Sequence, residues 1–162
     1  MSLFPLSEDY EVIASEELSH DLNQAIESLS HRAGLKIPID RDLNAVVVGE
    51  QGTPVAALWT SWRSDRFAFD VVVDSQARGK GLAKYLVQHA ICAFNEDRKA
   101  YDDALMVIDV VNPIMKQLLE DHFGFSVGFR RGPKRWEMIP TFGESGEVVI
   151  APSENVCEEF VE

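Results

Sequence analysis

The stretch from Val71 to Ala90 constrains this chain most, because an apolar run meets two closely spaced glycines and then changes its periodicity. "VVVD" ends a run of Val and Phe that is typical of a buried strand, while Leu82 and Leu86 begin a pattern of helical spacing. Gly79 and Gly81 lie between the two patterns. A strand that passes directly into a helix indicates a βα unit, so at least part of the sheet is expected to be parallel.

The remaining patterns predict one mixed α/β domain over residues 1–140. An antiparallel meander is expected to run into a βαβ unit, with helices on the faces of a central mixed sheet. The predicted elements are a first strand at "YEVIA", a helix at 15–32 capped by Ser15, a hairpin turning at "EQGTP", a strand at "FAFDVVVD", a long helix from Leu82, a buried strand at "ALMVIDVV", a helix at 113–123 and a last hairpin, "FSVGFRR" with "RWEMI". Residues 141–162 form an acidic extension without a predicted place.

Composition indicates a globular chain and excludes several classes of protein. The 162 residues are 46% hydrophobic and 26% charged. No apolar run approaches the ~20 residues of a membrane-spanning helix, and the first residues resemble no secretory signal, so a cytoplasmic protein without a membrane partner is expected. Cys92 and Cys157 have no metal-site spacing, and no metal is predicted.

The net charge of −12 lies almost entirely at the two ends of the chain. Residues 1–31 hold seven acidic residues and residues 141–162 hold six, and neither segment contains Lys or Arg. Such acidity argues against nucleic acid as a partner, because phosphate contacts require an excess of basic residues. It fits a cationic substrate, and solubility explains it as well.

The glycine turn admits two interpretations. A helix N-terminus carries unpaired N–H groups and about half a positive charge, so this turn, with Arg78 and Lys80, suits a phosphate. An ordinary βα connection with solvated basic side chains is the other interpretation. Two familiar phosphate loops do not fit, because Asp74 stands where a Walker-type loop needs glycine and Lys84 where a dinucleotide fingerprint needs its last glycine.

"VDSQARGKGLAKYL" resembles the acetyl-CoA loop of the GCN5-related N-acetyltransferase (GNAT) superfamily, whose signature is [RQ]-x-x-G-x-[GA]. Two registers match, Arg78-x-x-Gly81-x-Ala83 and Gln76-x-x-Gly79-x-Gly81, and the first agrees better with the apolar helix positions that follow. "VVNPIMKQLLEDHFGF" and "RWEMI" then follow in the order typical of the superfamily. The resemblance therefore covers most of the predicted domain.

The resemblance implies a GNAT-like fold with acetyl-CoA as cosubstrate. In the superfamily the sheet splays beside the strand before the loop, and the pantetheine arm pairs with that strand. Asn112 would reach the same arm through its side-chain amide, although capping the helix that follows it is an equally good role. The implied cofactor-binding residues are Val71, Val72, Val73, Arg78, Gly79, Lys80, Gly81, Leu82, Ala83 and Asn112.

The implied reaction is direct transfer of an acetyl group to a primary amine of a small molecule or peptide. A free alkylamine has a pKa of about 10.4, so a general base is useful. Asp70 and Asp109 are the candidate bases and His122 is a candidate acid. Many members carry a Tyr acid seven residues after the Asn, and here that position is Leu119. This difference leaves open a non-catalytic acyl-CoA-binding or protein-interaction module, with a homodimer as an alternative to a monomer.

The last hairpin, "FRRGPKRW", concentrates basic residues near a site that borders the acceptor in the superfamily. They are Arg130, Arg131, Lys134 and Arg135. Three roles are compatible with them: holding an acidic group of the substrate, forming an exposed turn, or docking the acidic tail at 144–162. The tryptophans Trp59, Trp62 and Trp136 are expected to pack within the sheet.

Overall fold

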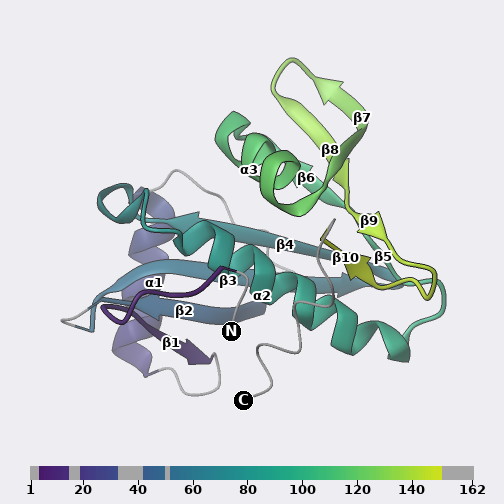
Figure 1. Cartoon of the computed structure of the whole chain (residues 1–162). Helices are drawn as coiled ribbons and strands as arrows, with labels where there is room; N and C mark the ends of the chain where they lie inside the picture. Colours follow the sequence, from purple (N-terminus) through teal and green to yellow (C-terminus); the bar gives the residue numbers. More distant parts are fainter. Residues whose placement is uncertain (1–3, 15–18, 33–41, 50–51, 151–162) are drawn as a thin grey trace. The chain divides into compact units, whose positions relative to one another are not determined.

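The computed structural model of the chain describes residues 4–14, 19–32, 42–49 and 52–150 (Figure 1). The predicted capping residue Ser15 lies outside the described residues. Contacts divide the chain into two compact units. Unit 2 comprises residues 4–61 and 69–90, and unit 1 comprises 1–3, 62–68 and 91–162.

The order of elements confirms a mixed α/β fold. Along the chain they are β1 (Glu11–Ala14), α1 (His20–Arg32), β2 (Asp42–Val48), β3 (Pro54–Arg63), β4 (Arg66–Val73), the 3₁₀ turn η2 (Ser75–Ala77), α2 (Leu82–Asp97), the 3₁₀ turn η3 (Arg98–Ala100), β5 (Leu105–Met106), β6 (Ile108–Val110), α3 (Pro113–Phe123), β7 (Ser126–Gly132), β8 (Arg135–Ile139), β9 (Thr141–Phe142) and β10 (Val148–Val149). β3, β4 and α2 continue from one unit into the other.

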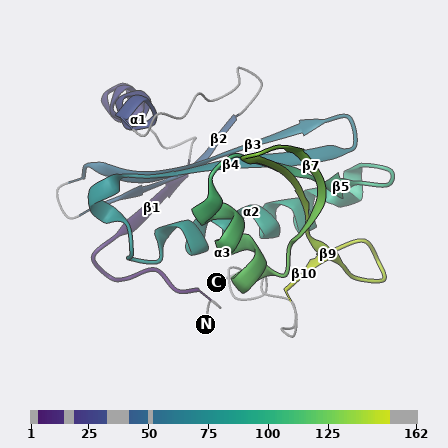
Figure 2. The same ribbon diagram turned by 90° about the horizontal axis from the view of Figure 1, so that it is seen from above.

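Unit 2 is built on the meander β1-β2-β3-β4. β1 and β2, and β2 and β3, pair antiparallel. Ile26 and Leu29 of α1 are three residues apart on one helix face and pack on this sheet together with Val72 of β4. Burying one such aliphatic side chain contributes about 1.5–3 kcal/mol. Figure 2 shows α1 on one face of the sheet and α2 on the other, which explains why β4 is apolar on both faces.

Unit 1 contains a three-stranded sheet in the order β6-β8-β7, in which both neighbouring pairs are antiparallel. Leu119 and Phe123 of α3 are fully buried one helical turn apart and form the apolar face of this helix. A separate aromatic group stacks Trp62 against Phe94 and Tyr101, with ring centroids 5.6 and 3.9 Å away. This packing of Trp62 agrees with its expected structural role.

The segment "ALMVIDVV" was expected to form one strand but forms two short ones. β5 pairs parallel with the start of β4, Arg66 opposite Leu105 and Phe67 opposite Met106, whereas β6 pairs antiparallel with β8. The change of partner interrupts the strand at Val107. In the described part of the chain, β4 therefore has no hydrogen-bonded strand on this side beyond Phe67.

Two amide side chains of α2 each form two hydrogen bonds to a residue far away in the sequence, one to its backbone N–H and one to its carbonyl. In unit 2, the buried Gln88 accepts from the N–H of Phe4 at 3.1 Å and donates to its carbonyl at 3.3 Å. In unit 1, Asn95 accepts from the N–H of Val148 at 2.8 Å and donates to its carbonyl at 3.0 Å. The second pair anchors β10, so residues 141–150, which had no predicted place, belong to the packed part of unit 1.

Candidate functional site

The turn between β4 and α2 begins at Asp74. Its N–H donates to the carbonyl of Val55 on β3 at 2.8 Å, and its carbonyl accepts from Ala77 at 2.9 Å. The Asp74 side chain also accepts from the N–H of Gln76 at 3.3 Å. These bonds form the 3₁₀ turn η2 and hold the first half of the connection in one conformation.

The second half of the turn is open around its two glycines. Gly79 and Gly81 both have φ of +80°, a conformation that side-chain-bearing residues rarely adopt. A Cβ built at either position would meet no atom within 4 Å. Space is therefore left beside the backbone on this part of the turn, as a bound phosphate group requires.

The N-terminus of α2 has unused hydrogen-bond donors. Its first intrahelical bond runs from the N–H of Tyr85 to the carbonyl of Gly81, at 3.1 Å. The N–H groups of Leu82, Ala83 and Lys84 precede that bond, so no carbonyl of α2 accepts from them. No side chain in the described residues caps them either. Three N–H groups and the positive end of the helix dipole thus converge at the glycine turn.

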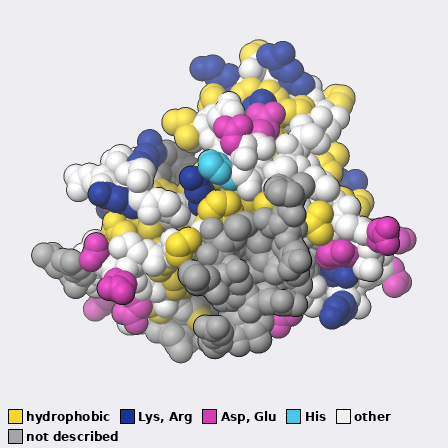
Figure 3. Space-filling model, viewed as in Figure 1, with side chains coloured by type: hydrophobic (Ala, Val, Ile, Leu, Met, Phe, Trp, Pro, Cys, Tyr) yellow, Lys and Arg dark blue, Asp and Glu magenta, His cyan; other side chains and the backbone are white. Residues whose placement is uncertain are grey.

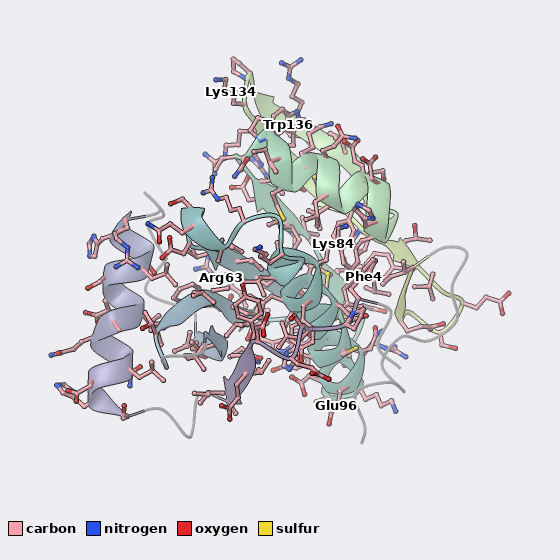
Figure 4. All side chains as sticks on the ribbon, turned by 60° about the vertical axis from the view of Figure 1, so that its left-hand side comes forward. Phe4, Arg63, Lys84, Glu96, Lys134 and Trp136 are labelled. Atoms are coloured by element: carbon pink, nitrogen blue, oxygen red, sulfur yellow. The ribbon has the colours of Figure 1, made fainter. Side chains whose placement is uncertain are left out.

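The side chains around the turn make it electropositive. Its one acid, Asp74, pairs with Arg32 of α1 at 3.2 Å. Within the described part of the chain, Arg78, Lys80 and Lys84 form no ion pair. Figure 4 labels Lys84, on the first turn of α2. Arg32 was absent from the predicted site, because nothing in its local sequence connects it with residue 74.

Asn112 closes the N-terminus of α3. Its Oδ1 accepts from the N–H of Ile114 at 2.9 Å, and Pro113 at the first helical position has no N–H to satisfy. The capping role predicted for Asn112 is therefore present. Its side-chain Nδ2 has no partner among the described residues and can still donate to a ligand. Val111 and Ile114, which flank it, are exposed.

β4 presents the predicted valines with the expected alternation. Val72 is buried against α1, whereas Val71 and Val73 are half-buried. By the two-residue period of a strand, Asp70 shares the face of Val72 and lies opposite Val71 and Val73. Asp70 is half-buried on that face.

The other candidate acid–base residues belong to unit 1. Asp109 is exposed, although it lies within an apolar run, because β6 is covered on one face only. Its carboxylate accepts from Arg135, with Nη2 to Oδ2 at 2.6 Å, and this partner raises the pKa of Arg135. His122 is exposed on the last turn of α3, while Leu119 is fully buried.

A polar pair on α3 was missed by the sequence analysis. Lys116 and Glu120, four residues apart, form an ion pair at 2.7 Å, and the Lys116 ammonium lies 5.5 Å from the ring centroid of Trp136. The ion pair could have been predicted from the sequence, because residues four positions apart on a helix are neighbours on its surface. Leu119, the residue before Glu120, is buried. Burial of Leu119 fixes which face of α3 points inward, and Glu120 is therefore only partly exposed.

A family model agrees with this geometry. Residues 6–125 match the model described as the acetyltransferase (GNAT) family. The chain belongs to the GNAT family. The matched residues include β4, the glycine turn, α2 and α3. No curated protein matches this GNAT chain in sequence.

Solved structures support the same fold at low sequence identity. Escherichia coli ElaA covers 80% of this chain and 96% of its own length, with a TM-score of 0.60 and 13% identity. The ribosomal-protein-S18-alanine N-acetyltransferase from Escherichia coli covers 80% and 90%, with a TM-score of 0.56 and 15% identity. The spermidine/spermine N-acetyltransferase SpeG from Vibrio cholerae covers 82% and 92%, with a TM-score of 0.56 and 14% identity. These likenesses show the fold.

The described residues contain neither a candidate membrane-spanning helix nor a candidate metal-binding group. None of the helices there combines the length and hydropathy needed to cross a membrane. No group of three or more His, Cys, Asp or Glu side chains in the same part of the chain is arranged to hold a metal ion.

Proposed function

We propose that this chain transfers an acetyl group from acetyl-CoA directly to a primary amine of a small molecule or a peptide, in the cytoplasm. The observation that carries the proposal is the open N-terminus of α2, preceded by two glycines of positive φ and flanked by basic side chains that form no ion pair among the described residues. Membership of the acetyltransferase family supports the reaction class.

The residues of the turn fit the diphosphate of acetyl-CoA. The N–H groups of Leu82, Ala83 and Lys84 would donate to its oxygens, and Arg78 and Lys80 would compensate its charge. The part of β4 beyond Phe67, which among the described residues has no strand neighbour on the side of β5, would pair with the amide groups of the pantetheine arm. Acetyl-CoA supplies an activated thioester, and a backbone N–H near Val73 would polarise its carbonyl.

Proton transfer is assigned to three side chains. Asp70 or Asp109 would take the proton from the ammonium form of the acceptor, because only the neutral amine attacks a carbonyl. His122 would return a proton to the leaving thiolate. Asp109 would act only after its carboxylate separates from Arg135, whereas His122 is exposed on the last turn of α3.

The decisive experiment measures binding and turnover separately. Calorimetry with acetyl-CoA tests the cofactor site, and release of free CoA across a panel of polyamines, amino sugars and peptides tests catalysis. We expect saturable binding and amine-dependent release for at least one acceptor class. His122→Ala should slow turnover by about a hundredfold or more while acetyl-CoA affinity is retained, if His122 is the acid.

A second candidate function is a non-catalytic acyl-CoA-binding module of the same fold. The observation that favours it is Leu119, a fully buried core residue at the position where the family often carries a Tyr acid. This alternative predicts acetyl-CoA binding without release of CoA for any member of the panel. Absence of acetyl-CoA binding would contradict both functions.

A further inference from the structure

The hairpin β7–β8 carries more positive charge than its own acids neutralise. Arg131 pairs with Glu137 at 2.6 Å, and Arg135 pairs with Asp109 at 2.6 Å. Two further cations, Arg130 and Lys134, have no ion-pair partner among the described residues. Figure 3 shows Lys and Arg side chains gathered over this hairpin, and Figure 4 places Lys134 at its tip.

The two unpaired cations differ in how firmly they are held. Arg130 donates to the carbonyls of Gly132 and Pro133, at 3.1 and 3.3 Å, so its guanidinium is fixed beside the turn. Lys134 is exposed and extends from the turn itself. A fixed and a mobile cation at one tip form a site for a carboxylate-rich segment.

Among the described residues, no helix covers one face of the sheet β6-β8-β7. The strand register places Asp109, Glu137 and Phe129 side by side on that face, whereas α3 covers the other. The Phe129 side chain is 59% exposed, and the Arg131 guanidinium lies 5.6 Å from its ring centroid. The surface therefore combines an exposed apolar side chain with two paired arginines and lies beside the unpaired Lys134 of the tip, which favours a partner that is both acidic and apolar.

Residues 151–162 of the chain have this composition. The sequence "APSENVCEEFVE" contains four glutamates, no basic residue, and the apolar residues Val156, Phe160 and Val161. We name this segment the acidic tail. Its charge of −4 complements the excess of positive charge on the hairpin.

The direction of the chain at residue 150 leads toward the hairpin. β10 is antiparallel to β9, with Val148 opposite Phe142 and Val149 opposite Thr141, so the chain leaves this pair toward the end of β8 at Ile139. About seven positions separate Thr141 from Lys134, a distance of ~23 Å for extended chain. Twelve residues reach ~40 Å, so the tail is long enough.

The geometry points to docking of the acidic tail on the hairpin β7–β8 of the same molecule. Both edges of β8 are already paired, with β6 and β7, so the tail cannot pair with β8 and would instead lie on the face that α3 does not cover. Its glutamates would then lie near Lys134 at the tip of the hairpin, and Phe160 would pack near Phe129. This docking does not depend on the proposed acetyl transfer.

The native thiol of Cys157, within the tail, provides the test. In the full-length chain carrying Cys92→Ser, a nitroxide attached to Cys157 should broaden the backbone amide signals of residues 129–135 at low ionic strength. Their peak intensities should fall at least twofold. At about 0.5 M salt, where the Debye length is ~4 Å, the intensities should recover. Unchanged hairpin signals at low salt, or broadening that survives high salt, would overturn the proposal.

A matched pair of variants locates the interaction. Lys134→Glu should abolish the broadening, whereas Lys99→Glu, which changes the net charge equally at an exposed residue of η3, should leave it intact. A mixture of isotope-labelled chain without nitroxide and unlabelled chain with nitroxide tests for a second copy. Broadening in that mixture would show docking between molecules and overturn the assignment.

A second measurement uses the native cysteines, in case Cys92→Ser disturbs the fold. Hydrogen exchange of the β7 amides is compared between the native chain and a full-length variant with Glu154, Glu158, Glu159 and Glu162 all changed to Gln. Exchange in β7 should be at least threefold faster in the variant. Equal exchange rates in the two chains would contradict docking by charge.

Discussion

The junctions that precede α2 and α3 carry out the same transition from strand to helix in opposite ways. At α3, Asn112 accepts from the N–H of Ile114 and Pro113 has no N–H, so two of the three positions before the first intrahelical bond need no further acceptor. At α2, Gly79 and Gly81 supply no side chain, and the first N–H groups of the helix are left without an acceptor.

The difference shows which terminus is built for a ligand. A side-chain cap stabilises a helix by about 1 kcal/mol, so a terminus without one forgoes that contribution. Both termini have the same dipole, yet among the described residues the α2 terminus has three N–H groups without an acceptor and unpaired cations beside it. Phosphate binding at α2 would offset what the missing cap costs.

Gly81→Asp should give the largest effect, because it gives the α2 terminus an acidic side chain of its own. The carboxylate would compete with phosphate for the same N–H groups and repel it, so acetyl-CoA affinity should fall at least about a hundredfold, ~3 kcal/mol. Isothermal calorimetry measures the change. Gly52→Asp is a matched control, because Gly52 also has positive φ, +73°, and open space around it. Equal affinity losses in both variants would contradict the site.

Asn112 allows capping and ligand binding to be separated. Asn112→Ala should reduce the free energy of unfolding by about 1 kcal/mol in urea titrations, because Ile114 loses its acceptor. Asn112→Asp keeps the acceptor and should retain stability. Because Asp has no amide donor, its acetyl-CoA affinity should still decrease severalfold if Nδ2 binds the pantetheine arm. If Asn112→Asp binds acetyl-CoA with wild-type affinity, Asn112 only caps α3 and does not bind the pantetheine arm.

A smaller effect is expected for Lys80→Ala at the open terminus. An exposed charge pair contributes about 1 kcal/mol at most, so acetyl-CoA affinity should fall up to about fivefold and depend less on salt. The measurement is calorimetry at two salt concentrations. Lys99→Ala, an exposed lysine on η3, serves as the control and should have wild-type affinity.

The free energy of unfolding is also expected to depend on pH, through a buried histidine of α2. Burial lowers the pKa of His89 on α2 below its ordinary value of 6.5, so the unfolded chain binds this proton more readily than the folded chain. The free energy of unfolding should therefore decrease as pH falls below about 6.5. Urea titrations at pH 7.5 and 5.5 measure it. His89→Gln should reduce this dependence, because Gln carries no titrating proton at this position. An unaltered dependence in His89→Gln would rule out His89 as its source.

Local sequence was sufficient for the elements that surround the site. The limits of α3 were predictable from Asn112, Pro113 and Gly124, because caps and helix stops act within a few residues. The glycine turn and the start of α2 at Leu82 were predictable for the same reason. The roles assigned to the cofactor and acid–base residues remain predictions.

Tertiary structure alone decided the features that depend on a distant partner. The division of "ALMVIDVV" into β5 and β6 follows from their pairing with β4 and β8, which the residues of the segment do not encode. The pairing of Asp109 with Arg135 and the clamping of Val148 by Asn95 join residues 26 and 53 positions apart. Periodicity and capping report on neighbours in sequence, whereas these contacts exist only once the sheet and helices have packed.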